Sequence, residues 1–259
     1  MTLKICVAGA TGRMGRMILA AAADQADLQA VAALSHAGSR NIGEVISGVT
    51  VTADARAAIA LCDVLIDFSK PEVSLENLAI CAALNKPAVV GTTGLNAAQY
   101  GHLQALSKQI PIVFSANMSL GVNVLQRLVE LGAKALRDQA DIEIIETHHS
   151  QKVDAPSGTA LMLGRAAAAA LGQPLDDIAV MSREGIIGVR KPGTIGFSTV
   201  RGGDIIGDHT VLFAAAGERI ELTHRAQSRA TYAHGALKAA KFVATANPGL
   251  YSMMDVLGI

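Results

Sequence analysis

The sequence has no excess of charge of either sign. Of its 259 residues, 22 are lysine or arginine and 22 are aspartate or glutamate, so the formal net charge is zero with histidine neutral. A general binder of nucleic acids or of anionic membranes would carry a basic excess. The balance argues against nucleic acid and against a membrane surface as partners. Charged residues are also few, at 17% against 51% hydrophobic residues, which indicates a packed globular protein.

Cysteine is scarce, and long apolar runs are missing. Cys6, Cys62 and Cys81 lie in apolar segments without the spacing of a metal site, so we predict buried, reduced thiols and no bound metal. No uncharged apolar stretch reaches the length of a membrane span, and the chain begins on a strand-like segment without the pattern of a signal peptide. We therefore expect a cytoplasmic protein.

The first part of the chain alternates apolar runs with helical patterns. Residues 3–8 form a short apolar run that leads through glycines into a helical segment, and residues 28–34 form the next strand. Strand, helix and strand within such a short span predict a parallel pair. Further buried strands are expected at 64–69, 87–93 and 110–117, with a helix over 96–109 capped by Asn96. The first 117 residues thus predict an open, doubly wound α/β sheet.

The pattern changes after this sheet. We expect a helix over 122–136, a strand over 140–149 and a helix over 156–172 that Gly172 ends. Three later segments are predicted to be consecutive antiparallel strands joined by glycine-containing turns, namely 194–203, 207–217 and 218–226. Such a sheet would be covered on one face only, and its open face is a candidate oligomer surface. The tail, 231–259, is expected to return to helix and pack on the first domain.

A glycine motif follows the first strand directly. Gly9, Gly12 and Gly15 have the spacing GxxGxxG and open the first helix. Glycines at these points allow a tight turn, close approach of the backbone to a pyrophosphate, and close packing of helix on strand. We therefore predict a dinucleotide site. An ordinary structural turn is the alternative.

Two further segments support a dinucleotide site. GTTG at 91–94 and SANMS at 115–119 both fall where strands end at the carboxyl edge of the sheet, where such folds bind ligands. Gly91, Thr92 and Thr93 could line the ribose of a nicotinamide nucleotide. A strand-end turn with a threonine cap is the competing interpretation.

The stretch ETHHSQKVDAPSGTA, residues 146–160, gathers groups for acid–base chemistry and anion binding. Adjacent residues at a strand end point to opposite sides, so His148 can face a reaction while His149 holds substrate. Lys152 adds a cation, and Gly158 and Thr159 begin a helix whose N–H groups favour a carboxylate. Together they predict a small anionic substrate beside a proton donor.

Simpler interpretations compete for the same stretch. The histidines could be a polar strand end, Lys152 and Asp154 a solvated loop pair, and Ser157 a helix cap. Metal binding is disfavoured because adjacent histidines lack the helical i, i+4 spacing of zinc sites. A serine hydrolase would need a nucleophile elbow, which the sequence does not contain.

The same stretch resembles the signature of the bacterial dihydrodipicolinate reductase family, also called 4-hydroxy-tetrahydrodipicolinate reductases, of diaminopimelate and lysine biosynthesis. The resemblance covers nearly the whole chain. It includes VAGATGRMG, IDFSKPE, VVGTTG, SANMSLGVN, SREG and PGTIGFSTVRGGDIIGDHTV. It implies a Rossmann-like domain that uses NADH or NADPH, a substrate domain with an open mixed sheet, and a homotetramer built through those sheets.

The resemblance also implies domain limits and roles. Residues 1–118 and 229–259 would bind the dinucleotide, and residues 119–228 would bind the dicarboxylate substrate and form the oligomer. His148 resembles the acid/base residue and Lys152 the proton donor, while His149, Gly158 and Thr159 resemble the residues that hold the substrate carboxylates. The expected cofactor-binding residues of the glycine loop are Gly9, Ala10, Thr11, Gly12, Arg13 and Met14. Those expected on the nicotinamide side are Gly91, Thr92, Thr93, Ser115, Ala116, Asn117 and Met118.

Three positions depart from the family pattern. Met118 replaces an aromatic residue often found beside the nicotinamide. Ser35 stands at the end of the second strand where many members carry an acid, and His36 where an arginine is common. A serine does not repel the 2′-phosphate of NADPH, so we predict that NADPH is used at least as well as NADH.

A nucleotide-sensing regulator that binds the cofactor without catalysis is the alternative function.

Overall fold

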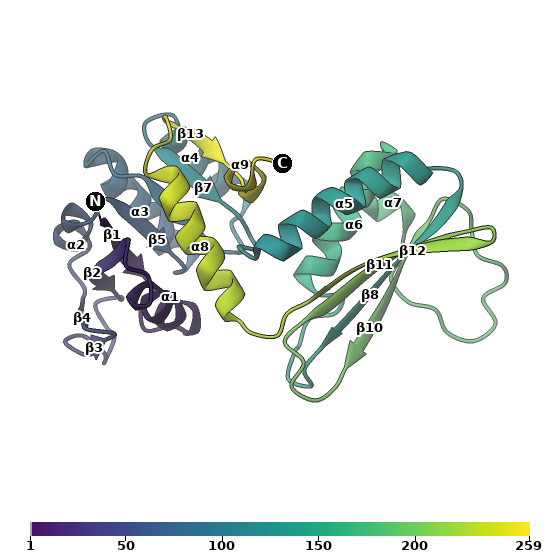
Figure 1. The fold of residues 1–259 in the computed structure, drawn as a ribbon, viewed down its shortest axis with the longest axis horizontal. Helices are drawn as coiled ribbons and strands as arrows, with labels where there is room; N and C mark the ends of the chain where they lie inside the picture. The colour runs from purple at the N-terminus through teal and green to yellow at the C-terminus, as the bar shows by residue number, and fades with distance from the viewer. Residues whose placement is uncertain (1) are drawn as a thin grey trace. The chain divides into compact units, whose positions relative to one another are not determined.

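The computed structural model describes residues 2–259, which separate into two compact units. One unit comprises the chain up to Leu120 together with Ala230–Ile259, and the other comprises Gly121–Arg229. Figure 1 colours the chain along its length and shows its C-terminal helices beside the strands of the first unit. The chain therefore crosses between the units twice, at 120–121 and at 229–230.

The first unit alternates strands and helices and ends with a returning helical segment. Its elements are β1 (Leu3–Ala8), α1 (Arg13–Ala23), β2 (Leu28–Leu34), β3 (Val45–Ile46), β4 (Val49–Thr52), α2 (Ala55–Leu61), β5 (Val64–Asp67), α3 (Pro71–Ala83), β6 (Ala88–Val90), α4 (Ala97–Ser107), β7 (Pro111–Phe114), α8 (Ala230–Val243), β13 (Gly249–Tyr251) and α9 (Met253–Leu257).

The strands of this unit form one doubly wound sheet. In the described residues its order is β13-β7-β6-β5-β1-β2-β4-β3, parallel except for the short β3–β4 pair. β1 pairs with β2 on one side and with β5 on the other, so the direction of winding reverses beside β1. The predicted Rossmann-like α/β class is confirmed. The sheet crevice lies beyond the carboxyl end of β1, as expected for such a reversal.

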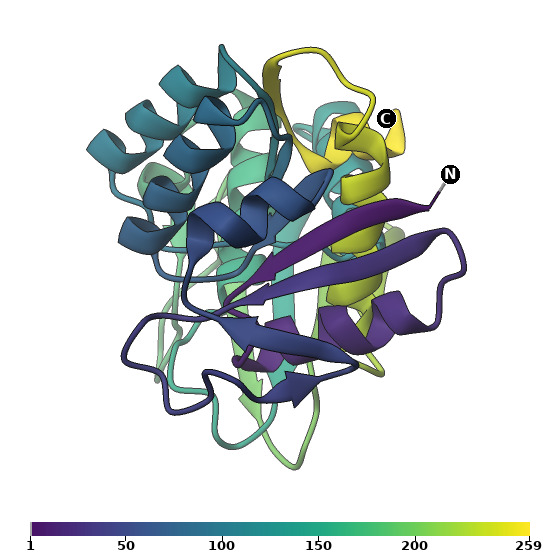
Figure 2. The same cartoon turned by 90° about the vertical axis from the view of Figure 1, so that its left-hand side faces the viewer.

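Helices cover both faces of this sheet, as Figure 2 shows. Residues of β1 alternate between two cores: Ile5 and Val7 pack in the core formed with α1 and α8, and Cys6 and Ala8 in the core formed with α2, α3 and α4. This alternation explains why β1 is apolar throughout, since both of its faces are buried. All three cysteines are free and buried, as predicted. Asn96 caps α4 and, with Gln99, forms a capping box.

The second unit combines two long helices with a mixed sheet. Its elements are α5 (Leu120–Leu136), β8 (Ala140–His148), α6 (Gly158–Leu171), α7 (Leu175–Ile178), β9 (Ala179–Val180), β10 (Ile195–Arg201), β11 (Asp208–Ala215) and β12 (Glu218–Arg225).

The predicted run of three antiparallel strands is wrong for its first member. β10 pairs parallel with β8, whereas β11 lies antiparallel on the other side of β8 and pairs with β12, giving the order β12-β11-β8-β10-β9. The glycine-containing segment 202–207, which suggested a hairpin, instead wraps around the end of β8. The backbone of this segment is hydrogen-bonded to that end of β8: Gly202 N donates to His148 O at 2.9 Å, and His149 N donates to Ile205 O at 2.7 Å. β8 is therefore central.

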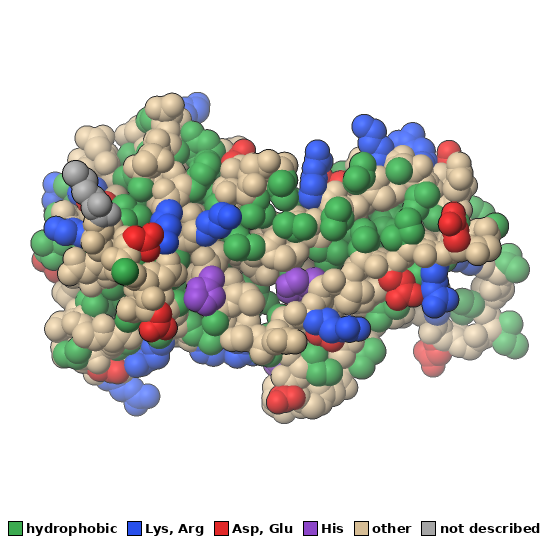
Figure 3. All heavy atoms as spheres, in the orientation of Figure 1, with side chains coloured by type: hydrophobic (Ala, Val, Ile, Leu, Met, Phe, Trp, Pro, Cys, Tyr) green, Lys and Arg blue, Asp and Glu red, His purple; other side chains and the backbone are tan. Residues whose placement is uncertain are grey.

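Helices cover one face of the second sheet, as predicted. Ile142 and Ile144 of β8 are buried in the core with α5 and α6, whereas Ile145 and Val200 on the opposite face are 38% and 48% exposed. Figure 1 shows α5, α6 and α7 on the same side of the strands. The outer surface of α5 also exposes Val124, Leu128 and Leu131, among charged side chains such as Arg127. Figure 3 shows hydrophobic side chains along this helix.

No helix among residues 2–259 is both long enough and apolar enough to cross a membrane.

Candidate functional site

A cleft of about 440 Å³ lies at the carboxyl ends of the strands in the first unit. Most of the predicted cofactor-binding residues line it, from the glycine loop and from the ends of β6 and β7. These are Gly9, Gly12, Arg13, Met14, Gly91, Thr92, Thr93, Ala116, Asn117 and Met118. The sequence analysis therefore identified segments that the fold brings to one cleft.

The shape of the loop depends on its glycines. Gly9 has φ +74°, and a Cβ there would lie 2.7 Å from the carbonyl oxygen of Phe68. A Cβ on Gly15 would lie 2.2 Å from the carbonyl oxygen of Gly9, so α1 packs directly against the loop. Gly12 precedes α1 and provides no side-chain cap. The first N–H groups of α1 are thus suited to a phosphate.

Thr92 supports a polar ligand in this cleft. Its side-chain hydroxyl is buried and has no hydrogen-bond partner among residues 2–259, and the residue is 2% exposed. A buried hydroxyl without a partner carries a free-energy penalty that a ligand can remove. Together with the glycine loop, this unpartnered group fits a nicotinamide dinucleotide.

Five predicted cofactor residues do not line the cleft. Ala10 is fully buried beneath the loop, and the Thr11 hydroxyl lies 3.1 Å from that of Ser35. Ser115 donates to the carbonyl oxygen of Asn117 at 2.8 Å and so shapes the turn that lines the cleft, whereas His36 is exposed. These placements are compatible with support of the loop and of the adenosine end.

The cleft also has lining residues that were not predicted as cofactor ligands: Gly15, Phe68, Ser69 and Tyr232. Phe68 and Ser69 follow β5 directly, so the rule that ligands bind at carboxyl ends of strands could have found them. Tyr232 comes from α8, more than a hundred residues later in the chain, and no local pattern marks it.

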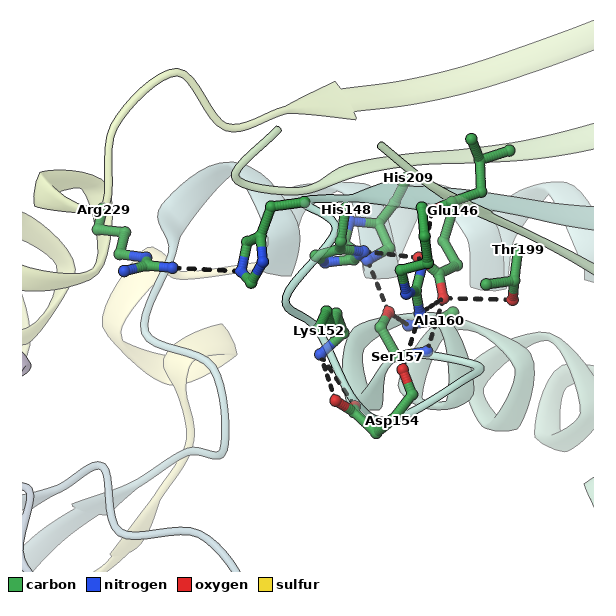
Figure 4. Close-up of polar contacts among 12 residues, drawn as sticks. Glu146, His148, Lys152, Asp154, Ser157, Ala160, Thr199, His209 and Arg229 are labelled. Atoms are coloured by element: carbon green, nitrogen blue, oxygen red, sulfur yellow. Dashed lines mark hydrogen bonds and ion pairs between the residues drawn. The ribbon is translucent and has the colours of Figure 1, made fainter. Parts of the chain in front are cut away.

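In the second unit, β8 places Glu146 and His148 on the helix-covered face of the sheet, because alternate residues of a strand share a face. His148 Nδ1 lies 2.6 Å from Glu146 Oε2. Arg201, paired with His148 in the β8–β10 register, contacts both oxygens of Glu146 at 2.7 and 2.8 Å. Figure 4 shows this cluster.

The ionisation of this cluster follows from burial and charge. Burial alone would raise the pKa of Glu146, but the hydrogen bonds from Arg201 and His148 lower it below its ordinary value. Burial lowers the pKa of His148 and outweighs the opposing effect of the Glu146 carboxylate. At neutral pH Glu146 is therefore ionised and His148 is neutral.

His209 and Ser157 complete the buried side of the cluster. The His209 ring stands edge-on to His148, with ring centres 5.0 Å apart, and its Nε2 lies 2.9 Å from Ser157 Oγ. Burial, together with the neighbouring His148, lowers the pKa of His209 to about 3. Ser157 Oγ also accepts from Ala160 N at 3.1 Å, so the cap interpretation of Ser157 is confirmed.

The remaining predicted residues lie around the start of α6. Lys152 Nζ contacts both oxygens of Asp154 at 2.7 and 2.9 Å, so the loop pair considered from the sequence is present. Lys152 is 20% exposed and Asp154 55% exposed, and this contact lowers the pKa of Asp154. His149 Nε2 faces Arg229 Nη2 at 3.4 Å. Gly158 and Thr159 open α6.

Sequence reasoning missed Arg201, His209 and Arg229 in this site. Arg201 and His209 reach it through sheet pairing across β8, which no local pattern in the sequence specifies. The cluster offers imidazoles, cations and a helix N-terminus, a combination that can hold a carboxylate and move a proton. In residues 2–259 no group of three or more His, Cys, Asp or Glu could hold a metal ion.

Two protein-family models match the chain. One, described as dihydrodipicolinate reductase, N-terminus, matches residues 3–118, and the other, described as dihydrodipicolinate reductase, C-terminus, matches residues 121–257.

Curated relatives match over the full length. The 4-hydroxy-tetrahydrodipicolinate reductase of Thiobacillus denitrificans is 52% identical over 266 residues, covering 100% of both chains. That of Burkholderia multivorans is 52% identical over 264 residues, covering 99% of this chain and 100% of the relative.

Solved structures share the fold. A dipicolinate-bound dihydrodipicolinate reductase from Paenisporosarcina sp. TG-14 has a TM-score of 0.80 at 23% identity, covering 98% of this chain and 99% of its own. A probable dehydrogenase from Thermotoga maritima has a TM-score of 0.66 at 14% identity, covering 98% and 92%.

Proposed function

Because the chain belongs to the dihydrodipicolinate reductase family, we propose that it reduces 4-hydroxy-tetrahydrodipicolinate to tetrahydrodipicolinate with NADH or NADPH. The reaction is a step of diaminopimelate and lysine biosynthesis. One reduced cofactor and one proton are consumed for each substrate, and one water leaves with the 4-hydroxyl. The observation that carries this proposal is the match of both family models and full-length relatives across both units.

We assign the cofactor to the first unit and the substrate to the second. The bound nicotinamide supplies hydride, and Gly9, Gly12 and the start of α1 would hold its pyrophosphate, with Thr92 giving a hydroxyl partner. Dipicolinate, bound in the Paenisporosarcina relative, is a planar ring with two carboxylates. His149 and the N–H groups of Gly158 and Thr159 would hold the substrate carboxylates, because a helix N-terminus favours an anion.

Proton transfer is proposed for Lys152 and His148. The Lys152 ammonium is a proton donor that must leave Asp154 to reach a substrate. Because Asp154 is exposed, breaking this ion pair costs little free energy. Neutral His148 can accept a proton and pass it on. The cationic groups around them offset negative charge that develops on the ring.

For the cofactor, we propose that NADPH serves at least as well as NADH. Ser35 lacks the carboxylate that would repel a 2′-phosphate, and its hydroxyl lies beside Thr11 of the loop. The nearby Glu44 carboxylate is paired with Arg16 at 3.0 Å. His36 and Arg40 are exposed and could approach a phosphate.

We further propose a homotetramer that acts in the cytoplasm. The open face of the second sheet exposes Ile145 and Val200, which an apolar contact between copies would cover. Three free cysteines fit a reducing compartment.

The test is oxidation of reduced nicotinamide in the presence of enzymatically generated substrate, run with NADPH and with NADH. We expect substrate-dependent turnover and a kcat/KM for NADPH equal to or above that for NADH. Cofactor binding without turnover would favour the nucleotide-sensing regulator. A preference for NADH of tenfold or more, about 1.4 kcal/mol, would overturn the cofactor assignment alone.

A further inference from the structure

His148 is held at one nitrogen of its ring. Nδ1 lies 2.6 Å from Glu146 Oε2, and Glu146 is itself fixed, being 1% exposed. Besides the two contacts from Arg201, Glu146 Oε1 accepts hydrogen bonds from Ser157 N at 3.0 Å and from Thr199 Oγ1 at 3.3 Å. An ionised carboxylate only accepts hydrogen bonds, so the proton between the two side chains belongs to His148 Nδ1.

Gly207 keeps space open at the other nitrogen. A Cβ at this position would lie 2.9 Å from His148 Nε2 and 3.3 Å from its Cδ2. Any side chain there would push a ring that Glu146 holds in place. The Glu146 carboxylate thus holds one nitrogen of the imidazole, and the lack of a side chain at Gly207 leaves room beside the other nitrogen.

We propose that Glu146 is a positioning residue that fixes His148 in its Nδ1–H tautomer and so makes Nε2 the atom that exchanges a proton with the substrate. The assignment rests on the proposed reductase function. Arg201 extends this arrangement, because its Nη2 also donates to the carbonyl oxygen of Asp154 at 2.7 Å and so links Glu146 to the loop that carries Lys152.

The charged and titratable groups around His148 come from every element packed against it. They are Glu146 on β8, Arg201 on β10, His209 on β11, and Lys152 and Asp154 in the loop after β8. Among these groups of the described chain, only the Glu146 carboxylate both contacts the ring and favours its protonated form. Loss of this negative charge should move protonation of His148 to lower pH.

The variant Glu146→Gln tests the tautomer because its neighbours dictate the orientation of the amide. Oε1 receives three fixed donors, from Ser157 N, Arg201 Nη2 and Thr199, whereas Oε2 receives one, Arg201 Nη1, besides the ring that can change tautomer, so the amide oxygen stays at Oε1. The amide nitrogen then faces His148 Nδ1 and donates to it, which forces the imidazole proton onto Nε2. The reactive nitrogen would lose its lone pair.

Kinetically, we expect Glu146→Gln to lower kcat by roughly 10²–10⁴-fold with little change in substrate KM, because the carboxylate-holding residues remain. The acid limb of the kcat/KM profile of the residual activity should move to lower pH. Glu146→Asp, which keeps the anion, should restore part of kcat. The matched control is Glu76→Gln at an exposed position of α3 in the first unit, and it should behave as wild type.

A direct measurement needs no variant. Imidazole ¹⁵N chemical shifts of His148 in the wild-type protein at neutral pH should report the Nδ1–H tautomer, and those of Glu146→Gln the Nε2–H tautomer. An Nε2–H tautomer in the wild type would overturn the proposal even if Glu146→Gln failed to fold. So would a folded Glu146→Gln that keeps wild-type kcat.

Failure of the two proposals can be distinguished. If wild-type protein does not oxidise reduced nicotinamide with this substrate, the proposed function fails whatever the tautomer. If wild type turns over and Glu146→Gln does so equally well, the function stands and the role of Glu146 is refuted. As a second probe, Gly207→Ala should lower kcat, because its methyl group would lie 2.9 Å from His148 Nε2 and would obstruct or shift that atom. An unchanged kcat in this variant would count against Nε2 as the reactive atom.

Discussion

The Lys152 ammonium, the proposed proton donor, belongs to a loop side chain that pairs with the half-exposed carboxylate of Asp154. Lys152→Ala should therefore lower kcat by roughly 10²–10⁴-fold while the free energy of unfolding changes by less than about 1 kcal/mol. Cofactor affinity, measured by titration of NADPH fluorescence, should be retained because the cofactor cleft is formed by the other unit. Lys134→Ala, at an exposed position of α5, is the control. Wild-type turnover by Lys152→Ala would reject the assignment.

His209 should make the protein sensitive to acid. Its pKa is about 3 in the folded chain against about 6.5 when unfolded, so its neutral form contributes stability that is complete above pH 6.5 and is lost as pH falls toward 3. Between pH 7 and pH 4.5 this group alone should remove roughly 2–3 kcal/mol of unfolding free energy. His209→Gln should lose that much less over the same interval.

Urea denaturation at the two pH values measures this difference. His102→Gln, the same change on the exposed surface of α4, controls for the substitution itself. An equal pH dependence in wild type and His209→Gln would show that the buried ring is not the source of acid sensitivity.

At the level of elements, the close packing of α1 on the glycine loop should be sensitive to a single added methyl group. Gly15→Ala places a Cβ 2.2 Å from the Gly9 carbonyl oxygen, which is backbone and cannot move without distorting the loop. We expect cofactor affinity to fall at least tenfold, and the free energy of unfolding to fall by roughly 1–3 kcal/mol, as at other overpacked sites.

Gly101→Ala provides the matched control within α4. A Cβ there meets nothing within 4 Å, so the variant should keep cofactor affinity and gain about 0.5–1 kcal/mol from improved helix propensity. Calorimetric titration with NADPH and thermal unfolding compare the two alanines. Equal affinity in both would show that the loop tolerates the displacement of α1.

Local patterns predicted the elements well and their pairing less well. β1, β2 and the Asn96 cap follow from apolar runs and capping chemistry, which act between neighbours in sequence. The parallel pairing of β10 with β8 depends on how residues 202–207 cross the end of β8, and glycines there are equally compatible with a hairpin. The same limit hid Arg201, which meets Glu146 through that pairing, and His209, which lies opposite Glu146 through the pairing of β11 with β8.

The predicted site residues divide along similar lines. Gly9, Gly12 and Gly91 could be placed at the cleft because strand ends in a doubly wound sheet share an edge. Tyr232 could not, since α8 returns to the first unit after the whole second unit has been traversed. Glu146 was visible as a residue two positions before His148 on the same strand face, but its role required the geometry of its donors.

For the whole molecule, hydride transfer requires the cofactor and the substrate to come within about 3–3.5 Å, yet the cofactor-cleft residues and the proposed substrate residues belong to different units. We expect closure about hinges at residues 119–121 and near Ser228, close to the two crossings of the chain. Small-angle scattering should show compaction only when NADPH and pyridine-2,6-dicarboxylate are both present. An unchanged radius of gyration with both ligands would contradict closure.

The central claim is that this chain transfers hydride from a nicotinamide cofactor to a cyclic dicarboxylate. NADPH carrying deuterium at the transferable position, incubated with wild-type protein and enzymatically generated 4-hydroxy-tetrahydrodipicolinate, tests it most directly. Mass spectrometry should find one deuterium in the tetrahydrodipicolinate for each NADPH oxidised. Product without deuterium, or no oxidation of the cofactor, would contradict the account.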